Sequence, residues 1–315
     1  MYDVLCVGIL VADVIVKPVK IMPEKGVLSP VDSIELYSGG NAMNVAINLK
    51  KLGVSSALVG MIGKDMFGEF LKSCLEKNNV SIASVKATDK VPTAASVLLI
   101  SDEGERSFWH CEGANGVLSI DDIDFDIVKK SNIVFVTGTY LMNTFDGEQT
   151  VDFLKQCKRL GKTTVLDVCW DSKGRWGKIL NPAFPYIDIF MPSIDEARQI
   201  SEEENVFKMA EKFMDRGAGS VVIKCGSDGC YVKESKTHDG YMMPAFKGIS
   251  AVDTTGAGDS FCSGFLAALS KGLDFKNCAL IGNAAGAHCV MDRGATTGMK
   301  SYKEICEFIH MQEEI

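Results

Sequence analysis

The stretch Asp253-Thr254-Thr255-Gly256-Ala257-Gly258-Asp259 decides how the rest of the chain is interpreted. Apolar residues recur after it at Phe261, Phe265 and Leu269, the spacing of one helix face, so a glycine-rich turn opens a helix. Free N–H groups at a helix start point outward with partial positive charge, and glycine lets an anion approach them closely. The stretch therefore predicts a phosphate-binding turn with an acid beside it.

Asp259 lies in the first turn of that predicted helix. The helix start favours the ionised carboxylate, which is able to accept a proton from an attacking hydroxyl. The amides of Gly256, Ala257 and Gly258 are suited to the charge that develops on a phosphoryl group during transfer. The alternative is that Asp259 only caps its helix and the glycines only form a turn. The two threonines before the glycines and the acid after them weigh against that alternative.

A second glycine-rich turn, Ser38-Gly39-Gly40-Asn41-Ala42-Met43-Asn44, precedes another helical pattern. Asn41 and Asn44 lie on one side of its first turn, and their amides both donate and accept hydrogen bonds, which suits a polyhydroxylated ligand. Taken alone, the pattern is better explained as a turn with an asparagine cap. Asp13 follows the first predicted strand, where it either holds two neighbouring hydroxyls or is a solvated loop acid.

Short apolar segments alternate with helical patterns along the whole chain. The predicted strands are 4–7, 57–62, 133–137, 163–166, 187–191 and 220–224, and the predicted helices are 41–52, 67–78, 145–160, 194–201 and 207–216. This alternation predicts an α/β fold with a mostly parallel sheet and helices on both faces. Ligands then bind at the carboxyl ends of the strands.

Two strand-like segments, at about 27–37 and 93–110, come with no helix. The second contains a turn composition, Asp-Glu-Gly-Glu, at 102–105. A small antiparallel β lid and an edge hairpin on the main sheet explain these segments equally well. We predict a single domain over residues 1–315 with the two segments as a small β subdomain, and a homodimer formed through the exposed edges of the lid.

Composition limits the classes of function. The 315 residues are 46% hydrophobic and carry a formal net charge of −8, which disfavours binding to nucleic acid or to a membrane surface. The 11 cysteines show no C-x-x-C pair and no zinc spacing, so they are typical of small buried side chains in a reducing compartment. An acid, Asp3, stands where a signal peptide has a base, and no segment has the length of a membrane span. These features predict a cytoplasmic protein.

Together the motifs resemble the PfkB family of carbohydrate kinases, which has the ribokinase-like fold. Residues 253–259 are similar to the C-terminal signature of that family, and residues 38–46 are similar to its N-terminal signature. Gly8 with Asp13 is similar to its first strand and sugar-binding acid, and the match in motif order spans essentially the whole chain. The resemblance implies an enzyme that transfers the γ-phosphoryl group of Mg-ATP to a hydroxyl of a sugar or sugar-like polyol.

The resemblance also implies a role for each matching residue. Asp259 would be the catalytic base, and the amides of Gly256, Ala257, Gly258 and Asp259 would form the anion hole. The residues implied to hold the sugar are Asp13, Gly39, Gly40 and Asn44, to which the amide spacing adds Asn41. The residues implied to hold ATP and its magnesium are Glu196, Lys224, Gly226, Gly229 and Asn283, with Ser193 standing where the family has an asparagine. A monovalent cation such as K⁺ is expected at Asp253, Thr255, Cys289, Asp292 and Gly294, mostly through backbone carbonyls.

The resemblance does not identify the acceptor. Ribokinase has asparagine where Val11 stands and lysine where Asn41 stands, and Cys169 replaces an asparagine of fructokinase-like members. A nucleoside kinase of the same fold is a rival, with Val11, Phe108 and Trp109 as an apolar slot. A sugar-phosphate kinase would need a cationic clamp, for which Arg106 and Lys90 are the candidates. A non-catalytic sugar- or nucleotide-sensing module is a further alternative, although it would have no need of Asp259.

Overall fold

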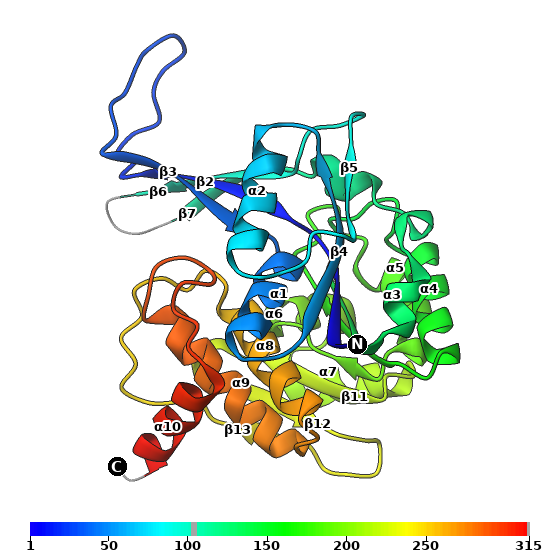
Figure 1. Ribbon diagram of the computed structural model, residues 1–315. Helices are drawn as coiled ribbons and strands as arrows, with labels where there is room; N and C mark the ends of the chain where they lie inside the picture. The colour runs from blue at the N-terminus through cyan, green and yellow to red at the C-terminus, as the bar shows by residue number, and fades with distance from the viewer. Residues whose placement is uncertain (102–105, 314–315) are drawn as a thin grey trace.

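The computed structural model describes residues 1–101 and 106–313 (Figure 1). Its main sheet has the strand order β13-β12-β11-β10-β9-β8-β1-β4-β5. The strands are β1 (Tyr2–Gly8), β4 (Ser56–Gly63), β5 (Val85–Thr88), β8 (Ser131–Thr139), β9 (Thr163–Val168), β10 (Ile189–Phe190), β11 (Ser220–Lys224), β12 (Cys230–Lys233) and β13 (Tyr241–Met243). From β5 to β11 neighbouring strands are parallel, and β12 and β13 continue the sheet antiparallel.

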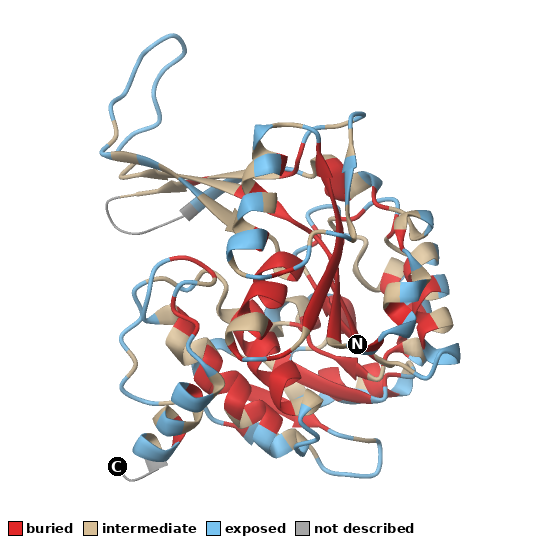
Figure 2. Ribbon diagram, in the orientation of Figure 1, coloured by how far each residue is buried: buried red, intermediate tan, exposed pale blue. Residues whose placement is uncertain are grey.

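Helices cover both faces of this sheet because its central strands are apolar on both sides. On β1, Val4 and Cys6 belong to one buried cluster, whereas Leu5 and Val7 belong to the other. The first cluster includes α1 (Asn41–Lys51), α2 (Met66–Lys77), α8 (Ala257–Ser270), α9 (Phe275–Val290) and α10 (Tyr302–Glu313). The second includes α3 (Phe125–Lys129), α4 (Glu148–Arg159), α5 (Trp176–Leu180), α6 (Ile194–Ser201) and α7 (Val206–Asp215). Figure 2 shows the buried strands between these two layers.

A smaller sheet projects from the main body (Figure 1). Its strand order is β3-β2-β6-β7, with β2 (Val11–Lys17), β3 (Ser33–Gly39), β6 (Ala95–Ile100) and β7 (Arg106–Cys111). The outer pairs β2–β3 and β6–β7 are antiparallel, and the central pair β2–β6 is parallel. Because this sheet is separate from the main one, the alternative of an edge hairpin on the main sheet is excluded.

The predicted fold class is confirmed, and the differences are local. The strand predicted at 220–224 coincides with β11, and the helix predicted at 194–201 coincides with α6. The segment predicted as strand-like from 27 becomes a strand only at Ser33. Strand β2 was not predicted because Asp13 interrupts its apolar pattern. The turn predicted at 102–105 lies outside the described residues, and the division into one domain with a lid stays a prediction.

The structure also bears on membrane-spanning helices and on the state of the cysteines. Within residues 1–101 and 106–313, no helix has both the length and the apolar character needed to cross a membrane. The cysteines of the described part of the chain are free thiols, and most of them are buried or half-buried.

Candidate active site

Asp259 occupies the third position of α8, where two amide side chains from α1 hold it. Asn41 Nδ2 donates to Oδ1 of Asp259 at 2.8 Å, and Asn44 Nδ2 donates to Oδ2 at 2.8 Å. Gly256 is the N-cap residue, and among the described residues no side chain caps this helix. The structure thus excludes the alternative that Asp259 only caps α8. Its carboxylate instead joins α8 to α1.

The start of α8 needs glycine for a steric reason. Gly256 has φ 77°, and a Cβ there would lie 2.5 Å from Cα of Ala295. The first-turn amides of a helix lack an intrahelical acceptor, and here Ala257 and Gly258 line a pocket. Of the predicted anion-hole amides, that of Ala257 donates to the carbonyl of Thr254 at 3.3 Å, whereas Gly258 lines the pocket beside it. A Cβ on Gly258 would lie 3.7 Å from Nζ of Lys224, so a cation borders the same turn.

The expectation that Asp259 is simply favoured as an ionised group needs correction. The residue is only 7% exposed. Burial raises the pKa of its carboxyl group, the hydrogen bond from Asn44 lowers it, the charge of Asp167 raises it and that of Lys224 lowers it, and the net shift is upward. Desolvation by the surrounding helices thus outweighs the effect of the helix start. A carboxylate with a raised pKa binds a proton more readily, which suits a general base.

Asp13 lies on strand β2, so the reading of this residue as a solvated loop acid is wrong. Burial raises its pKa to about 6, the hydrogen bond with Ser96 lowers it and the charge of Asp259 raises it. Two glycines make room for this arrangement. A Cβ at Gly39 would lie 1.9 Å from Oδ2 of Asp13, and a Cβ at Gly40, which has φ 90°, would lie 2.5 Å from the carbonyl oxygen of Ile9.

The structure therefore brings together the residues predicted to hold the sugar and places the predicted base beside them. Two of them are already engaged. The side-chain oxygen of Asn41 accepts from the thiol of Cys169 at 3.1 Å, and its Nδ2 donates to Asp259. The amide that was predicted to bind a ligand therefore already has protein partners. Asn44 also donates to Asp259, and its buried Oδ1 has no partner among the described residues. The side-chain amides of Asn41 and Asn44 therefore hold the carboxylate of Asp259 in place.

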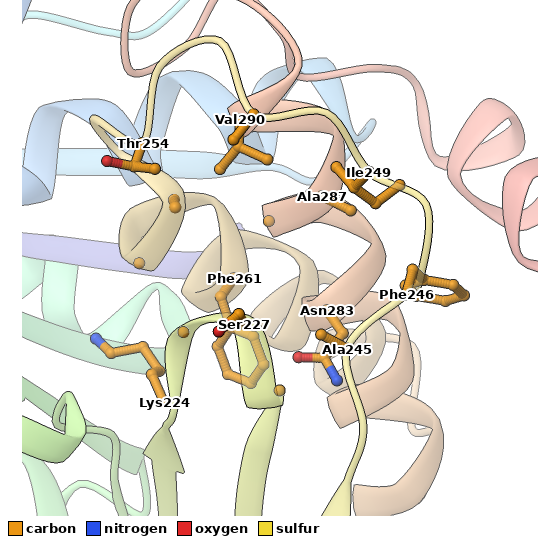
Figure 3. A pocket seen from close by; sticks show the side chains of 16 residues that line it. Lys224, Ser227, Ala245, Phe246, Ile249, Thr254, Phe261, Asn283, Ala287 and Val290 are labelled. Atoms are coloured by element: carbon orange, nitrogen blue, oxygen red, sulfur yellow. The ribbon is translucent and has the colours of Figure 1, made fainter. Parts of the chain in front are cut away.

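A pocket of about 340 Å³ lies on the other side of the α8 start. Its labelled side chains come from the end of β11 and the turn after it, from α8 and α9, and from the segment between β13 and α8 (Figure 3). Phe246, Ile249 and Val290 give it an apolar wall, whereas Lys224 lies at the end next to Gly258. A concave, mostly apolar site with a cation at one end suits a nucleotide base with its phosphates toward α8.

The predicted nucleotide residues Gly226, Gly229 and Asn283 line this pocket. Gly229 has φ 94°, and a Cβ there would lie 2.1 Å from the carbonyl oxygen of Met243, so the turn needs glycine. Asn283 Nδ2 donates to the carbonyls of Met243 at 3.1 Å and Pro244 at 3.0 Å. Asn283 thus fixes the segment that borders the pocket.

Lys224 forms an ion pair that the sequence analysis did not predict. Its Nζ lies 2.7 Å from Oδ2 of Asp167 at the end of β9, and both side chains are largely buried. Burial opposes the charge on Lys224, but Asp167 and Glu196 outweigh that effect and raise its pKa. The signal in the sequence was a lone acid at the carboxyl end of a predicted strand, where ligands of a parallel sheet bind.

Ser193 and Glu196 form a reciprocal capping box at the start of α6. Glu196 Oε2 accepts from the amide of Ser193 at 2.8 Å, and Ser193 Oγ accepts from the amide of Glu196 at 3.4 Å. The pKa of Glu196 is raised to about 7, first by burial and then by the charge of Asp167, while Lys224 acts in the lowering direction. Ser193 also bridges to Lys224 on β11, so the structure brings the predicted phosphate and magnesium residues together.

The family model described as pfkB family carbohydrate kinase matches residues 1–301. The chain belongs to this family. Its named relatives are kinases, and members of the family are phosphotransferases that act on sugar hydroxyls.

Several relatives of this PfkB-family kinase act on different acceptors according to their names. A 5-dehydro-2-deoxygluconokinase of Clostridium perfringens is 26% identical over 305 residues, which is 91% of this chain and 88% of that protein. An ATP-dependent 6-phosphofructokinase of Thermoanaerobacterium thermosaccharolyticum is 27% identical over 300 residues, 93% of this chain and 89% of that one. The crystal structure of a ribokinase from Thermotoga maritima has a TM-score of 0.85 and 25% identity, and covers 98% of this chain and 100% of its own.

The residues expected to bind a monovalent cation in this PfkB-family kinase also come together. Asp253 accepts from the amides of Thr255 at 2.9 Å and Gly294 at 3.0 Å, which ties the segment before α8 to the loop after α9. Cys289 Sγ donates to the carbonyl of Thr255 at 3.4 Å, and the amide of Asp292 donates to the carbonyl of Cys289 at 3.2 Å. Within the described residues no group of three or more His, Cys, Asp or Glu side chains is placed to hold a metal ion. A cation here would therefore rely on backbone oxygens.

The residues suggested for a nucleoside acceptor are not grouped as that reading requires, and those suggested for a sugar phosphate are only partly described. Phe108 and Trp109 are consecutive on β7, so their side chains point to opposite faces of the small sheet. Val11 is only 4% exposed. These three residues therefore do not line one slot for a nucleoside base. Lys90 is exposed outside the strands of the small sheet, and the side chain of Arg106 is not among those described.

Proposed function

We propose that this protein is an ATP-dependent carbohydrate kinase that transfers the γ-phosphoryl group of Mg-ATP to a hydroxyl of a sugar or sugar-like polyol. One observation carries the proposal. The carboxylate of Asp259 is held by Asn41 and Asn44, its charge acts on Asp13 of the small sheet, and its helix neighbour Gly258 lines the pocket. A base in that position is adjacent both to the residues proposed to hold the acceptor and to the pocket proposed to hold the nucleotide.

In the proposed reaction, Asp13 and the turn around Gly39 and Gly40 orient the acceptor. Asp259 accepts the proton of the attacking hydroxyl, and the first-turn amides of α8 stabilise the charge on the phosphoryl group. The small sheet acts as the lid of a single domain and excludes water, so that ATP is not hydrolysed. The side-chain amides of Asn41 and Asn44, which also belong to the proposed acceptor site, hold the carboxylate of Asp259 in its orientation during the reaction.

The nucleotide side fits ATP by shape and charge. The apolar wall of the pocket suits a base, and the buried Lys224 is placed for a phosphate. Gly226 and Gly229 allow the turn after β11 to approach the nucleotide. Magnesium, oriented through water by Glu196, would neutralise phosphate charge. K⁺ at Asp253, Thr255, Cys289, Asp292 and Gly294 would fix the loops that support the α8 start, since oxygen donors suit such a cation.

The test is product formation. The protein is incubated with Mg-ATP and a panel of pentoses, hexoses, inositols, sugar acids and nucleosides, and ADP and phosphorylated acceptor are quantified by a coupled assay and by ³¹P NMR. We expect acceptor-dependent ADP release with a sugar or polyol, and a higher rate when K⁺ replaces the larger tetramethylammonium ion. Binding of sugar and ATP without any transfer would favour a sensing module instead. Transfer to nucleosides alone would overturn the choice of acceptor.

We also propose a homodimer through the lid. Ile34 and Leu36 on β3 and Trp109 on β7 are exposed on the face of the small sheet that points away from Asp13. Covering them removes apolar surface from water. Light scattering at micromolar concentration should give twice the mass of the chain, and Leu36→Lys should give a monomer. A monomeric parent protein would contradict this proposal.

A further inference from the structure

The segment between β13 and α8 forms one wall of the pocket of about 340 Å³ beside the α8 start (Figure 3). Asn283 Nδ2 donates to the carbonyl of Pro244 at 3.0 Å near the first end of this segment, and the amide of Val252 donates to the carbonyl of Val290 at 2.7 Å near its second end. Between these anchors, residues 245–251 form no hydrogen bond with any described residue. Side-chain packing therefore holds the middle of this wall.

Phe246 is the aromatic residue of this middle part, and it lines the pocket. Its ring contacts that of Phe308 on α10, with centroids 5.0 Å apart and planes tilted by 59°. Phe308 also meets the ring of His288 on α9 edge to face, with centroids 4.7 Å apart and planes at 61°. Tilted aromatic pairs at such distances attract one another beyond the effect of their buried area. Three rings from three segments thus form a continuous row that ends at the pocket.

The imidazole of His288 takes part in this row as a packing group. Its buried Nε2 has no hydrogen-bond partner among the described residues. Desolvation and the charge of Lys300 lower the pKa of His288, the charge of Glu304 raises it, and the net shift is downward, so the ring is uncharged at neutral pH. Ala287 lines the pocket, whereas His288 and Phe308 are not among the described residues that line it. Both rings therefore act on the pocket through a neighbour.

We infer that α10 belongs to the nucleotide site, and that Phe308 and His288 are positioning residues that set the affinity for the nucleotide by holding Phe246 in the pocket wall. The acceptor side is built from α1 and the small sheet, whereas α10 packs on α9. Affinity for the acceptor should therefore not depend on this row of rings. The inference rests on the proposed kinase function and adds a supporting element to its nucleotide site.

The experiment measures Mg-ADP binding by calorimetry, which requires no acceptor, and the KM values of ATP and of the acceptor by steady-state kinetics. In the full chain, Phe308→Ala should raise the Kd of ADP and the KM of ATP about three- to tenfold, the effect of one lost aromatic pair. The KM of the acceptor and kcat should stay within about twofold, since only binding shared by ground state and transition state is lost. His288→Ala should act in the same direction, and Phe308→Tyr and His288→Phe, which keep a ring, should match the parent.

A double variant tests whether Phe308 acts through Phe246. Residues that act through one contact are not additive, so Phe246→Ala combined with Phe308→Ala should bind ADP no more weakly than Phe246→Ala alone. Multiplied effects would mean that Phe308 acts by another route and would overturn the inference. Phe308→Leu keeps the apolar bulk without the ring, and it should give a smaller rise in Kd even if Phe308→Ala does not fold.

The matched control is Phe207→Ala, which removes a ring from α7 in the other helical layer. Phe207 pairs with Tyr231 at the same centroid distance of 5.0 Å. We expect the Kd of ADP in this variant to equal that of the parent. An unchanged Kd in Phe308→Leu and His288→Ala overturns the inference while leaving the kinase proposal intact, and so does an equal rise in the KM of the acceptor. A parent protein that does not bind Mg-ADP overturns the proposed function itself.

Discussion

The starts of α8 and α6 place an acid at the same helical position and use it in opposite ways. At α6, Ser193 caps the helix and Glu196 closes the capping box, so both side chains satisfy local backbone amides. At α8, Gly256 is the cap and Asp259 turns away to the amides of α1. The glycine cap leaves the carboxylate of Asp259 free to accept from Asn41 and Asn44 instead of from its own helix. At α6, the serine cap stabilises the helix start, but the capping box engages the acid of that turn with a backbone amide.

The two helix starts are coupled by one buried ion pair. Asp167 raises the pKa of both Asp259 and Glu196, and Lys224 lowers both. The ion pair between Lys224 and Asp167 therefore sets the charge around the base and around the proposed magnesium acid together. Removing either partner would leave an unpaired buried charge. Under the proposed function, α8 is the catalytic start and α6 the supporting one, and each can be tested separately.

The largest effect is expected at α8. Asp259→Asn removes the proton acceptor, so turnover should fall by on the order of 10²–10⁴-fold, the usual range for loss of a general base. Asp259→Asn keeps only one acceptor oxygen for the side-chain amides of Asn41 and Asn44, so a fall in melting temperature would report the junction between α8 and α1 and not a lost cap. Steady-state kinetics and thermal melts measure the two quantities, and calorimetric binding of the sugar to the variant should match the parent. Near-normal turnover would defeat the assignment.

A smaller effect is expected at α6. Glu196→Gln keeps an acceptor oxygen for the amide of Ser193, so the capping box is preserved. It removes the charge that orients magnesium through water, and outer partners of a metal typically contribute 10- to 100-fold to affinity or activity. When activity is titrated with Mg²⁺, the concentration that gives half-maximal activity should rise by about 10- to 100-fold in the variant. An unchanged titration curve would show that Glu196 serves only the helix.

Sequence patterns predicted the parts of the site that are contiguous in the chain. The turn at 253–259 carries its amides, its glycines and its acid within seven residues, so its chemistry is visible without the fold. The ion pair between Lys224 and Asp167 joins residues 57 positions apart. It depends on how β9 and β11 are ordered in the sheet, and no local pattern reports that order.

Local reasoning also misjudged two acids. Asp13 was placed after a strand because a carboxylate interrupts an apolar pattern, yet the fold puts it within β2. The pKa of Asp259 was judged from the helix start alone, whereas packing of α1 against α8 buries the group and reverses the direction of the shift. Periodicity records which residues are apolar, and it does not record which polar residues the fold will desolvate. Functional acids are the residues for which that difference matters most.

The smallest expected effect is a change in how the melting temperature depends on pH when the acid of α6 is replaced. Glu196 has a pKa of about 7 in the folded protein against an ordinary value of 4.5, so folding takes up a proton between these two values. The stability contributed by this group is therefore greatest in acid and declines as pH rises from about 4.5 to about 7. Glu196→Gln removes that decline, so the melting temperature of the variant minus that of the parent should increase from pH 5 to pH 8. Ser193→Ala is the matched control, since loss of a cap costs about 1 kcal/mol at either pH. An equal difference at pH 5 and pH 8 for Glu196→Gln would mean that the acid of α6 is not desolvated as the structure indicates, and that the contrast with α8 lies in capping alone.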